Sequence, residues 1–191
     1  WNSMVDYGES GSFQENYSDV IGESVENFTR GSNDWIFGGD ENSGGPYRDL
    51  ADPPRLSAAG FPPSPDRYYH ENFYCGTENH GGMHINANIL NKAAYLTSQG
   101  GSFNGCQIAG IGLDKMQQIW HRAVTVYFST TETFNQGYAA FIQACNDLYS
   151  EDDCAELTKA LQAVELDQPG RCSGIPGVPA TCADGCPEDP N

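Results

Sequence analysis

Apolar residues recur every three to four positions in five separate segments, and this spacing constrains the fold more than any other feature of the sequence. Such spacing places one stripe of apolar side chains along one face of a helix. The first segment spans residues 12–30 and is followed by Gly31, a typical helix stop. The other four span residues 86–98, 113–128, 134–149 and 152–164. The sequence therefore predicts a mostly α-helical fold of about five helices.

Two stretches lack this period. Residues 32–79 are rich in Gly, Pro, Asp and Tyr, and the stretch is too long for a plain connection, so we expect an ordered segment that is pinned by an ion or lines a substrate. Residues 169–191 hold few apolar side chains but five prolines and three cysteines. We therefore predict a helical domain over residues 1–165 and a Cys/Pro/Gly-rich tail over residues 166–191.

Seven cysteines in 191 residues indicate disulfides and an oxidising compartment, so we expect a secreted, extracellular protein. Cys145 and Cys154 flank the connection between two predicted helices, and a bridge across that hairpin is predicted. Cys75 with Cys106 is the other pairing considered. The three tail cysteines leave one over, for a partner elsewhere or in another molecule. They are Cys172, Cys182 and Cys186.

The formal net charge of −17 disfavours binding to nucleic acid or to anionic membranes. No apolar run reaches the length of a membrane span, and Trp1 does not open a signal peptide, which suggests a chain processed or truncated at its start. We expect no nucleic-acid partner and no membrane insertion. Such an acidic surface fits a salt-tolerant secreted protein or one that binds divalent cations.

Glu15 and Asp19 lie four residues apart on the first predicted helix, so both carboxylates face the same way. One could ligate a metal ion while the other orients a neighbouring ligand. Further along, Gly81 and Gly82 allow a close backbone approach just before His84 at a predicted helix start. Taken singly, a helical Glu and a helix-start His are usually solvated residues without a special role.

Read together with residues 47–53, 92–101 and 110–115, these segments resemble the thermolysin family of secreted zinc metalloendopeptidases from about Asp6 to Val164. The resemblance implies the C-terminal, mostly helical lobe of such an enzyme, with zinc and calcium as cofactors and a peptide or protein as substrate. The family's HExxH helix, which carries two zinc ligands and the general base, has no counterpart in these 191 residues. The nearest string, residues 70–74, has Tyr74 in place of the second histidine. The implied partner is an N-terminal peptidase half that carries HExxH.

The resemblance also implies roles for individual residues. Glu15 would be the third zinc ligand, and Asp19 would receive the N–H of a ligating histidine. His84 would donate a hydrogen bond to the oxyanion, and Arg48 would grip the substrate carbonyl beyond the scissile bond. Asn79 stands where the family usually has an aspartate that holds this imidazole. A neutral amide still orients the ring but stabilises the imidazolium less.

Three apolar residues fall where the family lines its primed-side specificity pocket, which suggests a preference for an apolar substrate residue. They are Phe37, Tyr47 and Met83. Aromatic side chains in loops serve equally often in simple packing.

A second group of acidic residues predicts a calcium site. Glu23, Glu26 and Asp34 are followed by Ile36, whose backbone carbonyl could add a further hard oxygen ligand. The spacing is similar to the single-calcium site of elastase-like family members, and Gly39 departs from the two-calcium pattern. An acidic helix end is the plainer interpretation, but like charges so close together repel without a cation.

Two hypotheses therefore stand. The first is the C-terminal half of a zinc metalloendopeptidase that hydrolyses peptide bonds once combined with an HExxH-bearing half. The second is a noncatalytic calcium-binding adhesion or structural module built on the same lobe, and a generic acidic helical domain has little support beyond composition. A partner chain that carries HExxH would separate the first two.

Overall fold

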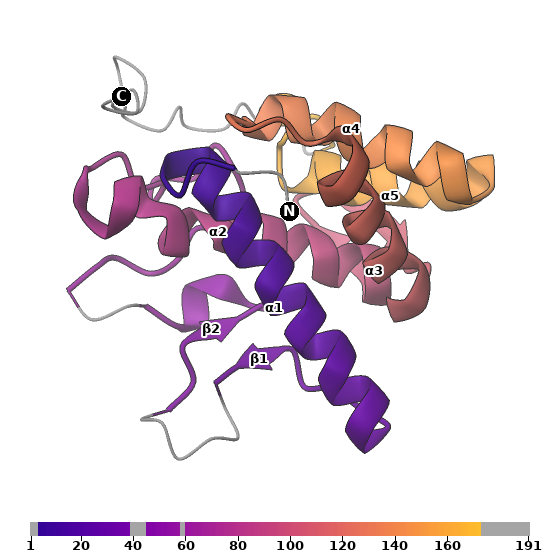
Figure 1. Ribbon diagram of the computed structural model, residues 1–191, viewed down its shortest axis with the longest axis horizontal. Helices are drawn as coiled ribbons and strands as arrows, with labels where there is room; N and C mark the ends of the chain where they lie inside the picture. Colours follow the sequence, from indigo (N-terminus) through magenta and orange to yellow (C-terminus); the bar gives the residue numbers. More distant parts are fainter. Residues whose placement is uncertain (1–3, 39–44, 58–59, 173–191) are drawn as a thin grey trace.

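The computed structural model describes residues 4–38, 45–57 and 60–172. Within these residues five α-helices dominate, which confirms the mostly α-helical prediction (Figure 1). The helices are α1 (Gly8–Arg30), α2 (Glu78–Gln99), α3 (Leu113–Arg122), α4 (Phe134–Leu148) and α5 (Glu151–Ala163).

The helix bounds differ from the predicted ones at two places. The predicted helix over residues 113–128 is split, because α3 ends at Arg122 and a π-helical turn, η2 (Ala123–Tyr127), follows it. The helix α2 begins before residue 86, but residues 79–82 within it wind left-handed, so regular α-helix begins near Met83.

The long irregular segment is ordered around two very short strands and one 3₁₀ turn. Strand β1 (Ile36–Phe37) pairs antiparallel with β2 (Arg48–Asp49), and η1 (Pro53–Arg55) follows. This small sheet lies beside the C-terminal half of α1 (Figure 1).

A hairpin of β3 (Gly100–Phe103) and β4 (Cys106–Ala109) was not predicted. It joins α2 to α3 where the sequence indicates only a break. The two ends of the hairpin meet so closely that a Cβ atom on Gly110 would lie 2.4 Å from the carbonyl oxygen of Ser98. Glycine is needed there for the close backbone approach.

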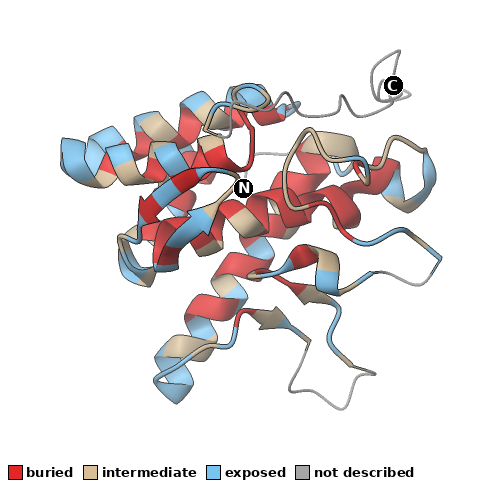
Figure 2. Cartoon of the chain, turned by 180° about the vertical axis from the view of Figure 1, so that it is seen from behind, coloured by how far each residue is buried: buried red, intermediate tan, exposed pale blue. Residues whose placement is uncertain are grey.

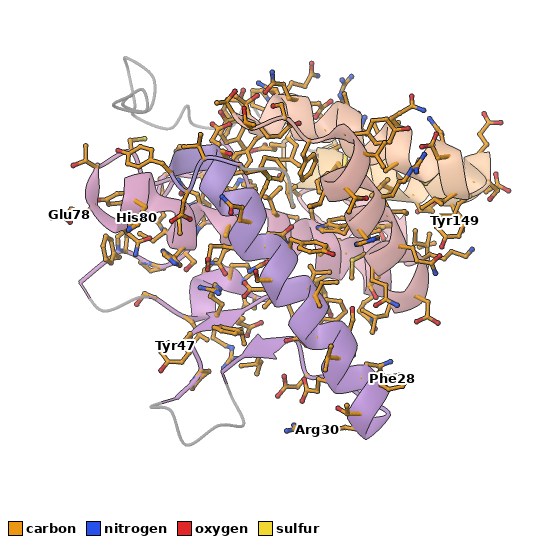
Figure 3. The ribbon with its side chains drawn as sticks, in the orientation of Figure 1. Phe28, Arg30, Tyr47, Glu78, His80 and Tyr149 are labelled. Carbon is orange, nitrogen blue, oxygen red and sulfur yellow. A yellow bond between two sulfur atoms is a disulfide. The ribbon has the colours of Figure 1, made fainter. Side chains whose placement is uncertain are left out.

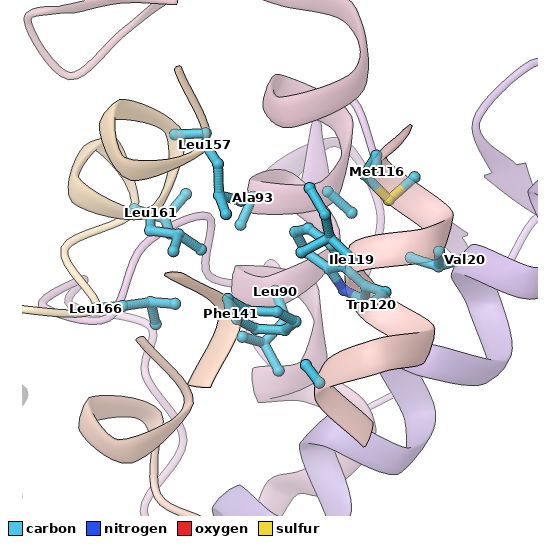
Figure 4. Packing of buried hydrophobic residues seen from close by; sticks show 14 of the residues in the cluster. Val20, Leu90, Ala93, Met116, Ile119, Trp120, Phe141, Leu157, Leu161 and Leu166 are labelled. Atoms are coloured by element: carbon cyan, nitrogen blue, oxygen red, sulfur yellow. The ribbon is translucent and has the colours of Figure 1, made fainter. Parts of the chain in front are cut away.

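The hydrophobic core lies where α2 meets the other helices, and the end of α1 stays largely exposed (Figure 2). Trp120 of α3 packs against Phe141 of α4 with ring centroids 4.3 Å apart, and Leu90 of α2 lies in the same cluster (Figure 4). On α1, Phe13 meets the ring of Phe134 edge to face. Aromatic burial of this kind is a large stabilising contribution in a domain of this size. No helix in the described part of the chain is long and apolar enough to cross a membrane.

The disulfides confirm one pairing and correct another. Cys145 bonds to Cys154 and ties α4 to α5, as predicted. The pairing of Cys75 with Cys106 is wrong, because Cys106 bonds to Cys172, while Cys75 is disulfide-bonded elsewhere. Cys182 and Cys186 lie outside the described residues.

Glu165 gives the physical reason for the corrected pairing. It takes a left-handed φ of 62° directly after α5 and turns the chain back toward the hairpin. Its Oε1 accepts hydrogen bonds from Asn104 Nδ2 and Gly170 N at 3.1 and 2.9 Å, which holds the next residues against the lobe. The predicted division between domain and tail at residue 165 stays a prediction. Leu166, on the tail side of it, is fully buried.

Candidate functional site

One face of α1 presents two carboxylates toward α2 and β2. Glu15 and Asp19 are one helical turn apart, as the sequence spacing indicates. Their environments differ, because the Asp19 side chain is 1% exposed whereas that of Glu15 is 23% exposed. The Asp19 carboxylate is therefore enclosed mainly by side chains of this lobe, while the Glu15 carboxylate is accessible to a ligand.

Arg48, at the start of β2, joins both carboxylates. Its Nε and Nη2 donate to the two oxygens of Asp19 at 2.7 and 2.6 Å, and Nη2 lies 3.3 Å from Glu15 Oε2. Burial alone lowers the pKa of the Arg48 guanidinium, but the charge and hydrogen bonds of Asp19 outweigh it and raise that pKa above its ordinary value. Arg48 is thus a fixed cation at this face.

A chain of buried side-chain hydrogen bonds supports Asp19 from behind. Asn91 of α2 donates to Asp19 Oδ2 at 2.8 Å, and Asn16 of α1 donates to Asn91 Oδ1 at 2.8 Å. The Trp120 indole N–H, which can only donate, reaches Asn16 Oδ1 at 2.8 Å and so fixes the orientation of that amide. This series of hydrogen bonds was not predicted from the sequence. The available signal was the presence of asparagines among apolar positions of two predicted helices.

His84 approaches Glu15 from the first regular turn of α2. Asn79 Oδ1 accepts hydrogen bonds from the backbone N–H and from ring Nδ1 of His84, both at 3.1 Å. Because the amide oxygen can only accept, Nδ1 carries the proton. The other ring nitrogen, Nε2, lies 3.5 Å from Glu15 Oε2.

The left-handed turn before His84 sets this geometry. Gly81 and Gly82 have φ of 69° and 78°, and a Cβ atom on Gly81 would lie 2.6 Å from the ring of Tyr7. Glycine is therefore required both for backbone conformation and for contact. Tyr7, the residue before α1, lies against this turn, a placement to which the sequence analysis gave no role. His80 lies within this turn, and its side chain is exposed (Figure 3).

A small pocket of about 170 Å³ opens beside these residues. It is lined by Pro46, Tyr47, Arg48, Ser57, Ser64, His84, Ile85 and Asn88. Tyr47, half exposed beside β2, is the one predicted pocket residue in this lining (Figure 3).

The other two predicted pocket residues lie elsewhere. Phe37 stacks beneath the guanidinium of Arg48, whose Cζ is 4.5 Å from the ring centroid. Met83 is buried and packs on α1, where a Cβ atom on Gly11 would lie 2.7 Å from its sulfur. Of the three predicted residues, Phe37 and Met83 therefore pack beside the pocket rather than line it.

The second acidic group gathers between the end of α1 and β1. Ligand oxygens of Glu23, Glu26 and Asp34 all lie within 4.8 Å of one another. Burial raises the pKa of Glu23 to about 7, although hydrogen bonds from Asn33 and from the backbone N–H of Trp35 oppose that rise.

The backbone of β1 places a fourth oxygen on the same side. The carbonyls of Trp35 and Phe37 bond to β2, so the carbonyl of Ile36 between them faces away from β2. The N–H of Ile36, which points the same way, donates to Asp34 Oδ1 at 2.9 Å. Arg30 forms an ion pair with Glu26 at 2.7 Å and offsets part of the negative charge. This donor set is carboxylate and carbonyl oxygen, the type preferred by calcium.

Comparison with known proteins was consistent across sequence and structure. The family described as "Thermolysin metallopeptidase, alpha-helical domain" matches residues 3–166. The chain is 39% identical to neutral protease B of Bacillus subtilis, covering 83% of this chain and 28% of that protein, and 40% identical to thermolysin of Alicyclobacillus acidocaldarius, covering 84% and 29%. A solved precursor of protealysin, a metalloproteinase from Serratia proteamaculans, has a TM-score of 0.70 at 20% identity, covering 85% of this chain and 52% of that one. The chain thus spans less than a third of the length of the two curated relatives and about half of the solved protealysin chain.

Proposed function

The chain belongs to the thermolysin metallopeptidase family, of which it is the α-helical domain, and from that premise we propose that it supplies half of the active site of a zinc endopeptidase. The other half is an N-terminal domain that carries HExxH, and the substrate is a peptide or protein. The relatives are about two to four times as long as the matched segment, which leaves room for such a domain.

One observation carries this proposal. Three elements distant in sequence bring a carboxylate, a guanidinium and an imidazole to one point, since Glu15 Oε2 lies 3.3 Å from Arg48 Nη2 and 3.5 Å from His84 Nε2. These groups sit beside a pocket rather than in the core. A purely structural lobe has no need for a convergent set of this kind at a concave surface.

Glu15 suits the third zinc ligand. Its carboxylate is partly exposed, and Arg48 and His84 hold one of its oxygens in place. With two histidines from the HExxH half it would complete a three-ligand site with an open position. When bound, zinc supplies an activated water and polarises the peptide carbonyl.

Asp19 suits the carboxylate that orients a ligating histidine. Its Oδ2 accepts from Arg48 and Asn91, whereas its Oδ1 accepts only from Arg48 among the described residues. A carboxylate oxygen has two lone pairs, so Oδ1 retains one for the N–H of a partner histidine.

His84 and Arg48 act on the substrate in this proposal. With its Nδ1–H donated to Asn79, His84 in its doubly protonated form would offer Nε2–H as a donor to the oxyanion that forms on the attacked carbonyl. Arg48 uses Nε and Nη2 for Asp19, and Nη1 takes no part in those bonds. Nη1 would therefore grip the carbonyl beyond the scissile bond, with the planar fork held rigidly by its other contacts.

Calcium is the proposed ion for the acidic group. Glu23, Glu26, Asp34 and the carbonyl of Ile36 offer four hard oxygens, and the HExxH half could add more. The site lies where the chain passes from the end of α1 into β1, so the ion would hold in place the small sheet that carries Arg48.

Secretion is the proposed location. Two disulfides join described cysteines, at Cys145–Cys154 and Cys106–Cys172, and such bonds persist in oxidising compartments.

Reconstitution tests the proposal. The protein is expressed together with its HExxH-bearing half, and zinc content and cleavage of a quenched fluorescent peptide are measured for the unaltered chain and for Glu15→Ala. We expect about one zinc per complex and cleavage for the unaltered chain, with both lost in the variant, and Glu78→Ala, exposed at the start of α2, serves as the matched control. A complex that binds calcium but neither binds zinc nor cleaves peptides would instead support a noncatalytic calcium-binding module.

A further inference from the structure

The tip of the β3–β4 hairpin carries the only Asn-Gly pair in the sequence, Asn104 and Gly105. Both residues have a left-handed φ, of 46° and 83°, and they form the turn between Phe103 at the end of β3 and Cys106 at the start of β4. Asn-Gly is a preferred pair for two-residue hairpin turns of this conformation. The proposed active site gives neither residue a chemical role.

An asparagine that precedes glycine carries an unusually reactive side-chain amide. The backbone nitrogen of the following residue can attack the amide carbon Cγ, and only glycine has no side chain to hinder that approach. Asparagine is also among the residues that heat damages most readily. Every other asparagine that has a following residue precedes one with a side chain. The amide of Asn104 is therefore the one in this chain that is most open to the attack.

We propose that Asn104 is a deamidation site, and that the contacts of its own side chain control the reaction in the folded protein. The backbone nitrogen of Gly105 bonds to Cγ of Asn104, the Cγ–Nδ2 bond breaks, and Nδ2 leaves as ammonia with the proton that Gly105 gives up. Water then opens the succinimide ring at either carbonyl and leaves aspartate or isoaspartate. The net reaction consumes water and releases ammonia, and it needs no oxidant, reductant or second protein.

The folded hairpin holds the nitrogen that must leave. Nδ2 of Asn104 donates to the carbonyl of Ala163 at 3.0 Å and to Oε1 of Glu165 at 3.1 Å. Both partners are acceptors, so the atom between them is the nitrogen of the amide, which has two hydrogens to donate. The side chain must leave these acceptors before Cγ can turn toward Gly105. Deamidation in the folded chain therefore depends on local opening of the hairpin tip.

The product cannot form the same contacts. An aspartate at position 104 has only acceptor oxygens at neutral pH, and these would face the carbonyl of Ala163 and the carboxylate of Glu165. The Glu165 side chain is 1% exposed, so water screens little of the repulsion between the two negative charges. Isoaspartate would in addition insert its Cβ atom into the backbone of a turn whose register is fixed by the pairing of Phe103 with Cys106.

The affected contacts hold the corner that follows α5. Ala163 is the last residue of that helix, and Glu165 turns the chain with its left-handed φ of 62°. Oε1 of Glu165 also accepts from the backbone N–H of Gly170 at 2.9 Å. Loss of the Asn104 amide should therefore loosen this corner, and the change is irreversible because no step returns ammonia to the side chain.

Deamidation rates of the folded and the unfolded chain test the inference. The full chain is incubated at pH 8 in buffer and in concentrated guanidinium chloride, and peptide mapping follows the mass of the fragment that contains Asn104. This fragment should gain the mass of water and lose that of ammonia in both solvents, and much faster in the unfolded chain. An amide that survives in guanidinium chloride, or equal rates in the two solvents, would overturn the inference.

Two substitutions of Glu165 separate the contact from the general stability of the fold. Glu165→Ala removes a charged acceptor, so the folded chain should deamidate roughly tenfold faster or more, while the unfolded rate stays the same. Glu165→Gln keeps an accepting oxygen and should deamidate more slowly than Glu165→Ala. The exposed Glu71→Ala is the control and should leave both rates unchanged. If Glu165→Ala has the rate of the unaltered folded chain, the contacts of Asn104 do not control the reaction.

The stability of the product gives a second readout. Deamidated protein has one more negative charge and is separated by ion exchange, and its Tm should be lower than that of the intact protein. Asn104→Asp should show a similar loss. Asn135→Asp, exposed in the first turn of α4, is the matched control for the added charge and should leave the Tm unchanged or slightly raised. A deamidated protein with the Tm of the intact one would contradict the inference, because the amide would then not hold the corner.

These measurements do not depend on peptidase activity. A chain that deamidates as expected but cleaves no peptide in the reconstituted complex would support this inference and remove the proposed function, and the reverse result would do the opposite.

Discussion

Arg48 and Asp19 form a two-point ion pair, in which two guanidinium nitrogens donate to the two oxygens of one carboxylate at 2.7 and 2.6 Å. The aspartate side chain is 1% exposed and the arginine side chain 12% exposed. A buried pair of this geometry is costly to break, because the remaining Arg48 charge is largely shielded from water and keeps only the longer contact with Glu15. It also fixes the β2 strand against α1, and with it one wall of the pocket beside His84.

Asp19→Ala should therefore lower the free energy of unfolding by about 3–5 kcal/mol. The same change should reduce kcat/KM of the reconstituted enzyme by roughly 10- to 100-fold, as is typical when the support of a metal ligand is lost. Urea unfolding and peptide cleavage measure the two effects. Asp147→Ala, which breaks the more exposed pair with Arg122, is the matched control and should change stability little. A loss equal to that of the control would show that the buried pair does not carry the stability assigned to it.

His84→Phe should separate catalysis from metal binding. Loss of one oxyanion donor typically lowers kcat by about 10²- to 10³-fold, while the zinc ligands stay in place. We expect that fall in kcat with unchanged zinc content, measured by single-turnover kinetics and metal analysis. His121→Phe, on the exposed face of α3, is the control for replacing a histidine. If His84→Phe instead loses zinc, His84 acts on the metal site rather than on the substrate.

Asn79 offers a finer test of the same histidine. Its Oδ1 is the acceptor for ring Nδ1, and Asn79→Asp would place a negative charge 3.1 Å from that nitrogen. A carboxylate there stabilises the imidazolium, so the alkaline limb of the pH–activity profile should move to higher pH. Peptide cleavage measured from pH 5 to 9 for the variant and for the unaltered chain tests this shift. An unmoved limb would mean that His84 does not control that side of the profile.

The helices were predictable because each carries its own apolar stripe, and a local pattern suffices to place it. The β3–β4 hairpin was not, because its formation depends on the close crossing of the backbone at Gly110 with Ser98, which leaves no periodic signal. The bond between Cys106 and Cys172 was likewise hidden, since it follows from the left-handed turn at Glu165.

The features of the site also fall into those that could be predicted from the sequence and those that could not. The spacing of Glu15 and Asp19 is a local property of one helix, so their common face could be read from the sequence. The hydrogen bonds by which Asn91 and Asn16 support Asp19 depend on how α1 packs on α2 and α3. The sequence around a helical asparagine does not indicate which residue it will bond to.

Glu9 should make stability depend on pH. Burial raises the pKa of Glu9 above its usual 4.5, while bonds from the N–H of Phe134 and the hydroxyl of Tyr68 oppose that rise. Because the folded pKa is the higher one, the stabilising contribution is complete below pH 4.5 and is lost as the pH rises through the folded pKa. Glu9→Gln should remove this loss. Its unfolding midpoint in urea should exceed that of the unaltered chain more at pH 8 than at pH 4.

The control for this prediction is Glu71→Gln, because Glu71 is exposed. It should shift the midpoint equally at both pH values. A Glu9→Gln effect that is likewise the same at pH 4 and pH 8 would mean that burial does not perturb Glu9.

Calcium removal should destabilise the lobe, and more strongly at alkaline pH. The pKa of Glu23 is raised by burial to about 7 from 4.5, so without an ion the fold loses stability as the pH rises between these values, by at most about 3–4 kcal/mol. Calcium reverses this trend, because it binds the ionised carboxylate and releases the proton. At a free calcium concentration 100 times the Kd, binding should add about 2.7 kcal/mol to the free energy of unfolding.

We expect the Tm difference between calcium and EGTA to be larger at pH 8 than at pH 5.5. This difference should vanish in Asp34→Asn. It should persist in the control Glu78→Gln, because Glu78 lies at the start of α2, far from the cluster. Magnesium at the same concentration should stabilise less, because it demands a stricter geometry. If the Tm is the same with and without calcium at both pH values, the acidic group does not bind calcium, and Arg30 is the main counter-charge of Glu26.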